Sequence, residues 1–431
     1  MELNKLDTNL SENTLIINGI EYDISSFIKS HPGGSVIKYS IGTDATRVFQ
    51  EFHYRSEKAK KILNSWNKDK KRVVKNKKVD NDIQLTNDFE SWRYQLEKEG
   101  FFEPSLLHVC YRIIELILIF WLGLYSASKG WIFTSILIHG IFGCRCGWVQ
   151  HECGHNSFTG YPKIDKVIQS ITIGFGLGGS GSMWNVMHNK HHATPQKEKH
   201  DMDLDTTPLV AFYDKAFEKN RKRFTLPLWW IKFQAYLFIP VTSGIFIPIF
   251  WMYYLHPRIV IRKRKYLQLF SMLSAHIIRT YLFQVYTGYE SIFYSYFLGF
   301  LLPIWVSGML LFGHFTLSHS FMPTIDEKNN KNWVRSALEH TVDISPHNPI
   351  VCWFMGYLNC QVIHHLFPTM PQFRQPYIYT KLKRFCKKNN LEYHVIGYFE
   401  ALSKTFKNMD EVGKKLYRQM SKGLLRTKDK I

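Results

Sequence analysis

The chain has 431 residues and a formal net charge of +20, and 45% of its residues are hydrophobic, 16% aromatic and 21% charged. That length suffices for two or three soluble domains or for one membrane enzyme with a soluble appendage. Lysine and arginine cluster beside apolar segments without any nucleic-acid-binding motif, so the charge favours attraction to anionic lipid, and we expect no nucleic-acid partner.

Cysteine usage excludes a disulfide framework. The seven cysteines are odd in number, and the first of them is Cys110, a pattern that suits a reducing compartment. The N-terminal stretch MELNKLDTNLSENTLI is polar and lacks the apolar core of a signal peptide. We therefore expect the first domain to stay in the cytosol.

Residues 14–85 predict a small α+β domain with a basic linker from about residue 67. TLIING is expected to be a short strand, NGIEYD a turn and SVIKYSIG the start of a helix. NKDKKRVVKNKK, residues 67–78, has almost no apolar residues and therefore predicts a solvated tether. Helical pattern resumes at TNDFESWRYQLEKEG, where Thr86 or Asn87 could cap the helix and Gly100 could end it.

Five apolar runs follow, each close to the ~20 residues that cross ~30 Å of hydrocarbon. They are residues 113–128, 131–149, 235–255, 266–286 and 292–312. Histidine clusters on the same side as the N-terminal domain would require an even number of crossings. Arg279 in the fourth run is costly in lipid and favours four crossings with that run at the interface. The basic segment HPRIVIRKRK after the third run favours a re-entrant third run instead.

Residues 86–431 thus predict an all-α integral membrane domain. It is expected to contain about four transmembrane helices, interfacial helices and a cytosolic cap that carries the histidine-rich segments.

Histidines are concentrated in three short boxes just outside the apolar runs, HECGH, HNKHH and QVIHH. In the first box, a spacing of four places both imidazoles on one helical face, as in known metal sites. In the third, a glutamine stands where the second has its first histidine. Three such boxes are hard to explain as packing, because imidazole at a membrane boundary gains little without a partner. The residues are His151, His155, His188, His191, His192, Gln361, His364 and His365.

The number of candidate ligands predicts two metal ions. Eight or so nitrogen ligands exceed the three or four that one zinc ion takes, and imidazole also suits iron, copper and nickel. GHFTLSHS adds His314 and His319 after the last apolar run, whereas His139 and His276 lie within apolar runs and are expected to be core groups. The segment HDMDLD, residues 200–205, could orient the second box or form a solvated loop.

The N-terminal domain supplies a candidate electron source. His31 and His53 stand 22 positions apart in SHPGGSVIKYSIGTDATRVFQEFH, and Gly33 and Gly34 permit a tight backbone close to a flat ligand. Two histidines from facing helices can hold a haem iron axially and leave no open position for oxygen, so such a centre only passes electrons. An electron source favours a redox-active metal over zinc at the boxes.

The pattern HPGG…DAT..F...H resembles the cytochrome b5 domain. With the three boxes, the chain from residue 14 to about 415 resembles the front-end fatty acid desaturases that carry a fused cytochrome b5 domain, and the glutamine of the third box is the most specific mark. RCGWVQHECGH, MWNVMHNKHHATPQ, HDMDLDTTP and GYLNCQVIHHLFPTMPQFRQP are most similar to algal desaturases of the Δ6 type. Ile363 stands where many front-end enzymes have glutamate, which weakens comparison with animal members.

The resemblance implies a role for each candidate. His31 and His53 would be the axial ligands of haem b. A di-iron centre, with O2 as co-substrate, would be the catalytic site, and Gln361 would contribute directly or through water. His314 would stay outside the ligand set. The implied metal ligands are His151, His155, His188, His191, His192, His319, Gln361, His364 and His365.

The implied reaction is a syn dehydrogenation that inserts a cis double bond between an existing one and the carboxyl end of a polyunsaturated acyl chain, with Δ6 as the expected position. Electrons would come from NADH through cytochrome b5 reductase. The substrate would be acyl-CoA or acyl-phospholipid. The enzyme would be a multi-pass protein of the endoplasmic reticulum, with haem domain and boxes in the cytosol. Trp148, Trp184 and Asn185 are candidate walls of the acyl channel or packing residues.

Alternatives remain open at this point. They are a Δ5 acyl desaturase, a Δ8 sphingolipid desaturase, a fatty acid hydroxylase and, in a different class, a haem-carrying membrane adaptor without catalysis.

Overall fold

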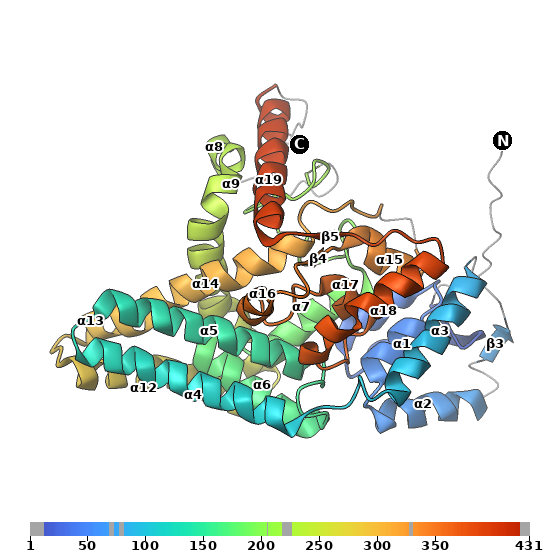
Figure 1. Ribbon diagram of the computed structural model, residues 1–431, viewed down its shortest axis with the longest axis horizontal. Coiled ribbons are helices and arrows are strands. Elements are labelled where there is room, and N and C mark those ends of the chain that lie inside the picture. The colour runs from blue at the N-terminus through green and yellow to red at the C-terminus, as the bar shows by residue number, and fades with distance from the viewer. Residues whose placement is uncertain are drawn as a thin grey trace.

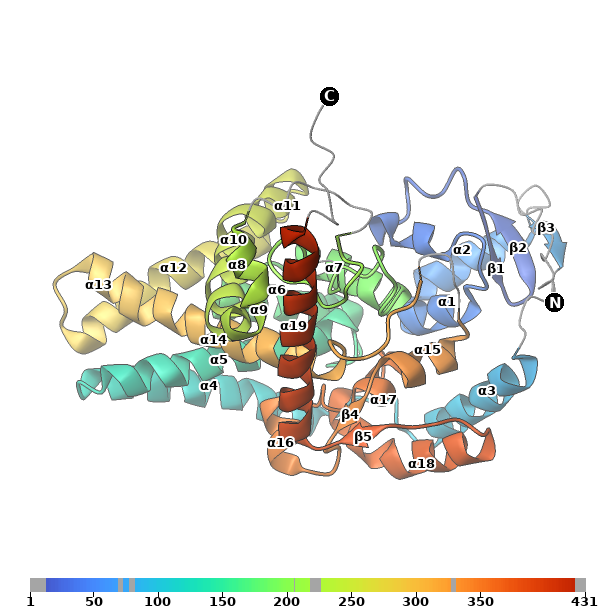
Figure 2. The same cartoon turned by 90° about the horizontal axis from the view of Figure 1, so that it is seen from above.

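The computed structural model describes residues 13–68, 73–76, 82–204, 206–217, 226–326 and 331–422. A small α+β part lies at one end of the molecule, and the long helices of the second part extend toward the other end (Figure 1). The turned view shows the same division (Figure 2). This architecture confirms the fold class that the sequence predicts.

The α+β part contains a three-stranded antiparallel sheet. Its order is β1 (Thr14–Ile17), β2 (Ile20–Asp23) and β3 (Val73–Asn76). Asn18 and Gly19 between the first two strands have φ values of 53° and 73°, as a two-residue hairpin turn of type I′ requires. The turn expected over NGIEYD is therefore limited to its first two residues, and the remainder is a strand.

Three helices complete this part. They are η1 (Gly34–Ser40), α1 (Thr46–His53) and α2 (Glu57–Lys68). They enclose an apolar core with the sheet, in which Tyr22 and Ile24 are fully buried. Of the expected linker, residues 69–72 and 77–78 lie outside the described residues, and the rest forms the end of α2 and strand β3.

Helix α3 (Ile83–Lys98) leads into the helical part. It begins upstream of the expected caps, because Leu85 and Phe89 are buried in the core that this helix shares with the C-terminal helices. It ends as predicted, just before Gly100, whose φ is +77°.

Helices α4 (Leu106–Ser128) and α5 (Ile132–Gly154) form the expected hairpin through Lys129 and Gly130. α5 packs very closely on α14 (Leu302–Phe315), because a Cβ added at Gly140 would lie 2.3 Å from Cγ1 of Val306. This close approach positions the end of α5, which carries the first histidine box.

The remaining helices fall into a membrane-side group and a cap. The first group contains α6 (Pro162–Leu177), α7 (Gly181–Ala193), the run of α8 (Leu228–Lys232), α9 (Gln234–Leu237), η2 (Phe238–Phe246), α10 (Ile247–Phe250), η3 (Trp251–Leu255) and α11 (His256–Arg262), then α12 (Tyr266–Thr287), α13 (Ile292–Tyr296), η4 (Phe297–Leu301) and η5 (Thr316–Ser318). The cap contains α15 (Trp333–His340), β4 (Asp343–Ile344), α16 (Pro349–Phe354), α17 (Gln361–Leu366), η6 (Gln372–Arg374), α18 (Gln375–Lys388), β5 (Val395–Ile396) and α19 (Tyr398–Ser421). Strands β4 and β5 pair in parallel.

Four helices among the described residues are long and apolar enough to cross a membrane. They are Leu106–Ser128, Ile132–Gly154, Gln234–Arg262 and Ile292–Ser318. The number agrees with the expected four, and by composition α12 is not among them.

The arrangement of the helices nevertheless favours α12 over Gln234–Arg262 as the third crossing. α12 packs against α6, α13 and α4, whereas α8 and α9 run across the direction of α12 in both views (Figures 1 and 2). The turn after α11 contributes Lys263 and Lys265 to the wall of the cavity that His31 and His53 line, so this turn lies on the side of the α+β part.

The charged side chain of Arg279, the reason to doubt that α12 crosses the membrane, is covered by other parts of the protein. Arg279 is 2% exposed, and its Nη1 donates to the carbonyl oxygen of Gly176 at 3.0 Å. The charge is therefore kept away from direct contact with lipid, which reduces the cost of a crossing by α12, and the re-entrant alternative for the third run is favoured.

This arrangement predicts the accessibility of the turn between α11 and α12. A cysteine introduced as Arg264→Cys in a Cys110→Ser background should react with a membrane-impermeant maleimide from the side that carries the α+β part. Glu290→Cys, in the turn between α12 and α13, is the matched control and should react only from the opposite side. Labelling of both positions from the same side would contradict the assignment of α12 as a crossing.

Candidate metal centre and haem site

The structure brings the three histidine boxes together although they are far apart in the sequence. His151 lies near the end of α5, and His155 follows its last turn. The second box lies on α7 and the third forms the start of α17. His319 follows η5 and joins them. Each box histidine is at most 6% exposed, so the cluster is closed to bulk water.

The first cluster contains His151, His155, His188 and His364, whose candidate ligand nitrogens all lie within 4.8 Å of one another. The Nε2 atoms of His155 and His188 are 3.0 Å apart. His192 borders this cluster, with its Nε2 at 3.0 Å from Nε2 of His188 and at 3.0 Å from Nε2 of His364.

The second cluster contains His191, His319 and His365, again with ligand nitrogens within 4.8 Å of one another. The Nε2 atom of His365 is 3.3 Å from Nε2 of His191 and 3.3 Å from Nε2 of His319. The side-chain amide of Gln361 lies 3.0 Å from Nε2 of His319 and 3.1 Å from Nε2 of His365. The glutamine of the third box therefore belongs to the second cluster.

Nitrogens that face nitrogens are the strongest sign of bound cations. Burial, the main cause, lowers the pKa of His155 to about 3 and holds the pKa values of His188, His192 and His364 well below the usual range. Neutral imidazole has one donor and one acceptor, so converging Nε2 atoms cannot all be satisfied by one another. A buried polar atom without a partner is costly, and a metal ion in each cluster would satisfy several nitrogens at once.

Hydrogen bonds behind the clusters orient individual rings. Nδ1 of His191 donates to the Asp201 carboxylate, with both oxygens at 2.9 Å, and this carboxylate also accepts the backbone N–H of Gln196 at 2.8 Å. Burial opposes protonation of His191, but the two nearby aspartates outweigh it and raise its pKa to about 9. Of the two interpretations of HDMDLD, the structure supports the orienting one at Asp201, while Asp205 lies outside the described residues.

Two residues outside the predicted site also support the boxes. The Gln372 side-chain amide is 2.6 Å from Nδ1 of His151, and its backbone N–H donates to Glu152 at 2.9 Å. Asp343 is fully buried and accepts the backbone N–H of Val362 at 2.7 Å, which holds the start of α17. Gln372 lies in the motif GYLNCQVIHHLFPTMPQFRQP, so its position downstream of the third box was the available signal.

Other candidates lie apart from the clusters. His314 is hydrogen-bonded through Nε2 to the Tyr398 hydroxyl at 2.9 Å, which places it outside the ligand set as expected. His139 is buried and bonds to the Ser135 hydroxyl as a core group, whereas His276 is half-buried and bonds to the Tyr296 hydroxyl. Trp148 is fully buried, and its Nε1 donates to the carbonyl oxygen of Phe354 at 3.1 Å.

In the α+β part, His31 and His53 face each other across a cavity. Their ring centroids are 6.3 Å apart. Two metal–nitrogen bonds would span about 4 Å of this distance. Nδ1 of His31 lies 3.1 Å from the Gly34 carbonyl oxygen and Nδ1 of His53 lies 3.0 Å from the Phe49 carbonyl oxygen, which leaves both Nε2 atoms for a common ligand. A Cβ added at Gly33 would lie 2.7 Å from Cε1 of His31, so this glycine makes room for the ring. The residues present fit a haem with two axial histidines.

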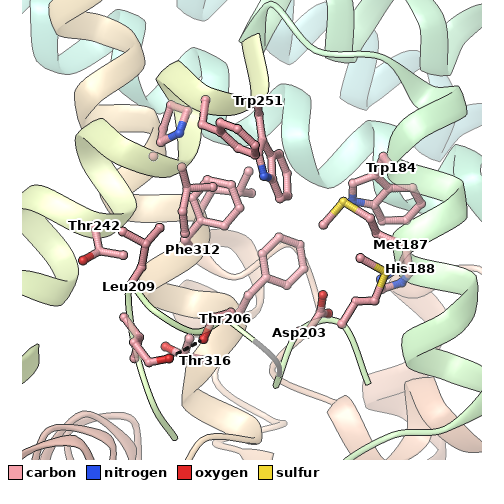
Figure 3. A pocket seen from close by; sticks show the side chains of 18 of the residues that line it. Trp184, Met187, His188, Asp203, Thr206, Leu209, Thr242, Trp251, Phe312 and Thr316 are labelled. Carbon is pink, nitrogen blue, oxygen red and sulfur yellow. Dashed lines mark hydrogen bonds between the residues drawn. The ribbon is translucent and has the colours of Figure 1, made fainter. Parts of the chain in front are cut away.

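An apolar cavity of about 370 Å³ lies against the second box. Figure 3 shows Trp184, Met187 and His188 on one side of it and Thr242 on the opposite side, with Trp251 above. Of the three proposed wall residues, Trp184 lines this cavity, whereas Trp148 and Asn185 do not. Its mostly carbon surface suits a flexible apolar chain, and the second box places ligand nitrogens directly at its wall.

Known proteins resemble both parts of the chain. The family model described as "Fatty acid desaturase" matches residues 126–397, and that described as "Cytochrome b5-like Heme/Steroid binding domain" matches residues 2–68. An acyl-lipid (8-3)-desaturase of Rebecca salina is 40% identical over 414 residues, which cover 95% of this chain and 94% of that protein.

Two further relatives extend the comparison. An acyl-lipid (8-3)-desaturase of Thraustochytrium sp is 37% identical over 413 residues, which cover 93% of this chain and 92% of that protein. The Delta(6)-fatty-acid desaturase fat-3 of Caenorhabditis elegans is 27% identical over 436 residues, which cover 90% of this chain and 94% of that protein.

The bond from His191 to Asp201 predicts a defect in metal binding. Asp201→Asn should weaken retention of the second-cluster metal by about 10- to 100-fold, the usual effect of losing a carboxylate behind a metal-bound histidine. Chelator-challenge assays with metal analysis would measure this. Asp203→Asn is the matched control, because Asp203 is half exposed and lies 3.6 Å from the same ring. Equal retention of metal in Asp201→Asn and the unmodified chain would contradict the orienting role.

Proposed function

The chain belongs to the fatty acid desaturase family and carries a fused cytochrome b5-like domain, and from that premise we propose that it is a front-end acyl desaturase with a di-iron centre. The observation that carries this proposal is the pair of imidazole clusters at the wall of an apolar cavity. We also propose residues 14–85 as the haem domain and residues 86–431 as the desaturase domain.

The chain's own residues would hold and align the reactants. The box histidines, with His319 and Gln361, would hold two iron ions, which would supply the activation of O2 that unactivated C–H bonds require. Asp201 and Gln372 would keep the ligand rings in their orientation. The walls of the apolar cavity would hold the acyl chain beside His188 and exclude water.

The haem domain would supply electrons. We propose that His31 and His53 hold haem b and that NADH–cytochrome b5 reductase reduces it from outside. The reductase and the haem domain would then share the cytosolic face of the endoplasmic reticulum membrane with the histidine boxes. The basic turn beside the haem cavity, with Lys263 and Lys265, supports this orientation by the positive-inside rule.

The relatives modify the expected position of the new bond. The two relatives at 40% and 37% identity are named (8-3)-desaturases, whereas the Δ6 enzyme is 27% identical. We therefore give the (8-3) specificity precedence over Δ6, which the motifs alone favoured. The words "acyl-lipid" in both names support an acyl-lipid substrate over acyl-CoA.

Substrate feeding tests the proposed reaction. A yeast strain that expresses the chain should be fed linoleic and α-linolenic acids, whose first double bond is at carbon 9, and dihomo-γ-linolenic acid, whose first double bond is at carbon 8. We expect mass spectrometry to locate one new double bond between the existing one and the carboxyl end, chiefly in the last substrate. Conversion of the first two would instead support Δ6, and an added hydroxyl group would contradict desaturation.

Loss of a single cluster ligand should abolish that product. His364→Ala removes a nitrogen of the first cluster, and product should fall below detection while the haem spectrum is retained. His347→Ala is the control, because this histidine is exposed and its ring contacts Tyr379 instead of the clusters. Wild-type product from His364→Ala would contradict the metal assignment.

The far wall of the apolar cavity should limit the length of the acyl chain. Thr242 is 1% exposed and lies across the cavity from His188 (Figure 3). Thr242→Phe should fill that end and shift preference toward shorter acyl chains, with iron and haem contents unchanged. A competition assay with acyl chains of different length would measure the shift. An unaltered preference in a fully iron-loaded variant would show that the chain does not reach Thr242.

A further inference from the structure

Three consecutive residues at the end of α1 face three different partners. Consecutive helix positions diverge by ~100°, so Glu51, Phe52 and His53 point in different directions. His53 faces His31 across the haem cavity. The Phe52 ring lies edge-on to the ring of His192, with their centroids 6.3 Å apart. One short segment thus touches the proposed haem site and a proposed iron ligand.

Glu51 holds this segment against the desaturase domain. Its carboxylate is fully buried, and Nε of Arg93 on α3 donates to it at 2.6 Å. The hydroxyl of Thr369, which follows the third box, donates to the other oxygen at 3.4 Å. A buried, charge-assisted pair is strongly directional, so it fixes the position of α1 between α3 and the end of the third box.

The next two residues of the chain, Tyr54 and Arg55, also hold α1 against the desaturase domain. The Tyr54 hydroxyl donates to Glu97 at 2.9 Å, and Nη2 of Arg55 donates to the carbonyl oxygen of Phe102 at 2.6 Å. These contacts describe a haem domain that is docked on its partner domain rather than tethered at a distance.

One cavity connects the two proposed cofactor sites. It has a volume of about 1380 Å³, and it is lined by His31 and His53 on one side and by His155 of the first box on the other. Phe52 is part of its wall, and its ring contacts His192 beside the first cluster. The apolar ring therefore occupies space that water would otherwise fill, and it is the side chain that spans from the haem helix to His192.

We propose that Phe52 is a positioning residue that couples the haem domain to the metal clusters. Its ring fills the gap beside His192 and sets the separation and packing across which single electrons pass. In each transfer a haem held by His31 and His53 would give up one electron and an iron ion held by the box histidines would accept it, so no further reactant is needed. This inference rests on the proposed function and adds the contact through which the two sites communicate.

Reoxidation of reduced haem tests the proposal independently of product analysis. The haem of the purified full-length protein, loaded with iron and acyl substrate, is reduced anaerobically and mixed with O2, and its absorbance is followed in time. Phe52→Leu should slow reoxidation severalfold, because loss of the ring removes the packing between α1 and His192. Haem content, iron content and reduction by an external reductant should stay unchanged. Phe52→Tyr, which keeps the ring, should restore the rate.

Tyr54→Leu is the matched control, because it also removes an aromatic ring from the domain contact but leaves Phe52 and His192 in place. Its reoxidation rate should stay closer to that of the unmodified chain than to that of Phe52→Leu, because Glu51 and Arg93 still hold α1 in place. If Tyr54→Leu slows the reaction as much as Phe52→Leu, the effect is loosening of the domains and the proposal fails. It also fails if Phe52→Leu reoxidises at the unmodified rate. Failure of the proposed function would differ, because the unmodified chain would then yield no unsaturated product.

Discussion

Neutral imidazoles that converge in a closed interior are the constraint on which the rest of the structure depends. Five pairs of their Nε2 atoms lie 3.0 to 3.3 Å apart. These nitrogens cannot all donate to their neighbours. Burial keeps the pKa values of His188, His192 and His364 low, so protonation does not resolve the conflict in and beside the first cluster at neutral pH. Cations between the rings resolve it, and the separation into two clusters matches two ions.

Three sets of contacts in the fold hold the histidine boxes in this arrangement. α5 approaches α14 closely at its glycines and presents the first box. The bond from Val362 to Asp343 holds the third box at the start of α17. The bonds of Asp201 and Gln372 fix individual rings from behind. An apolar cavity on one side and the haem domain on the other then give the clusters access to an acyl chain and to electrons.

Much of this site could be predicted from sequence because its signals are local. The spacing of four in the first box places His151 and His155 on one helical face, and HPGG with a later histidine indicates haem. Contacts between distant segments left no such signal. The division of the ligands into two clusters and the contact of Phe52 with His192 depend on tertiary packing. The choice of the third crossing stayed open for a related reason, because Arg279 is charged in the sequence but is covered by protein in the fold.

The most direct test of the account is the amount of non-haem iron in the same purified sample in which haem is measured. The protein should be reconstituted anaerobically with ferrous iron, freed of loosely bound metal and assayed for iron and haem per chain. The account predicts two non-haem iron ions for each haem. A folded sample that is fully loaded with haem and retains no stoichiometric non-haem iron would contradict it.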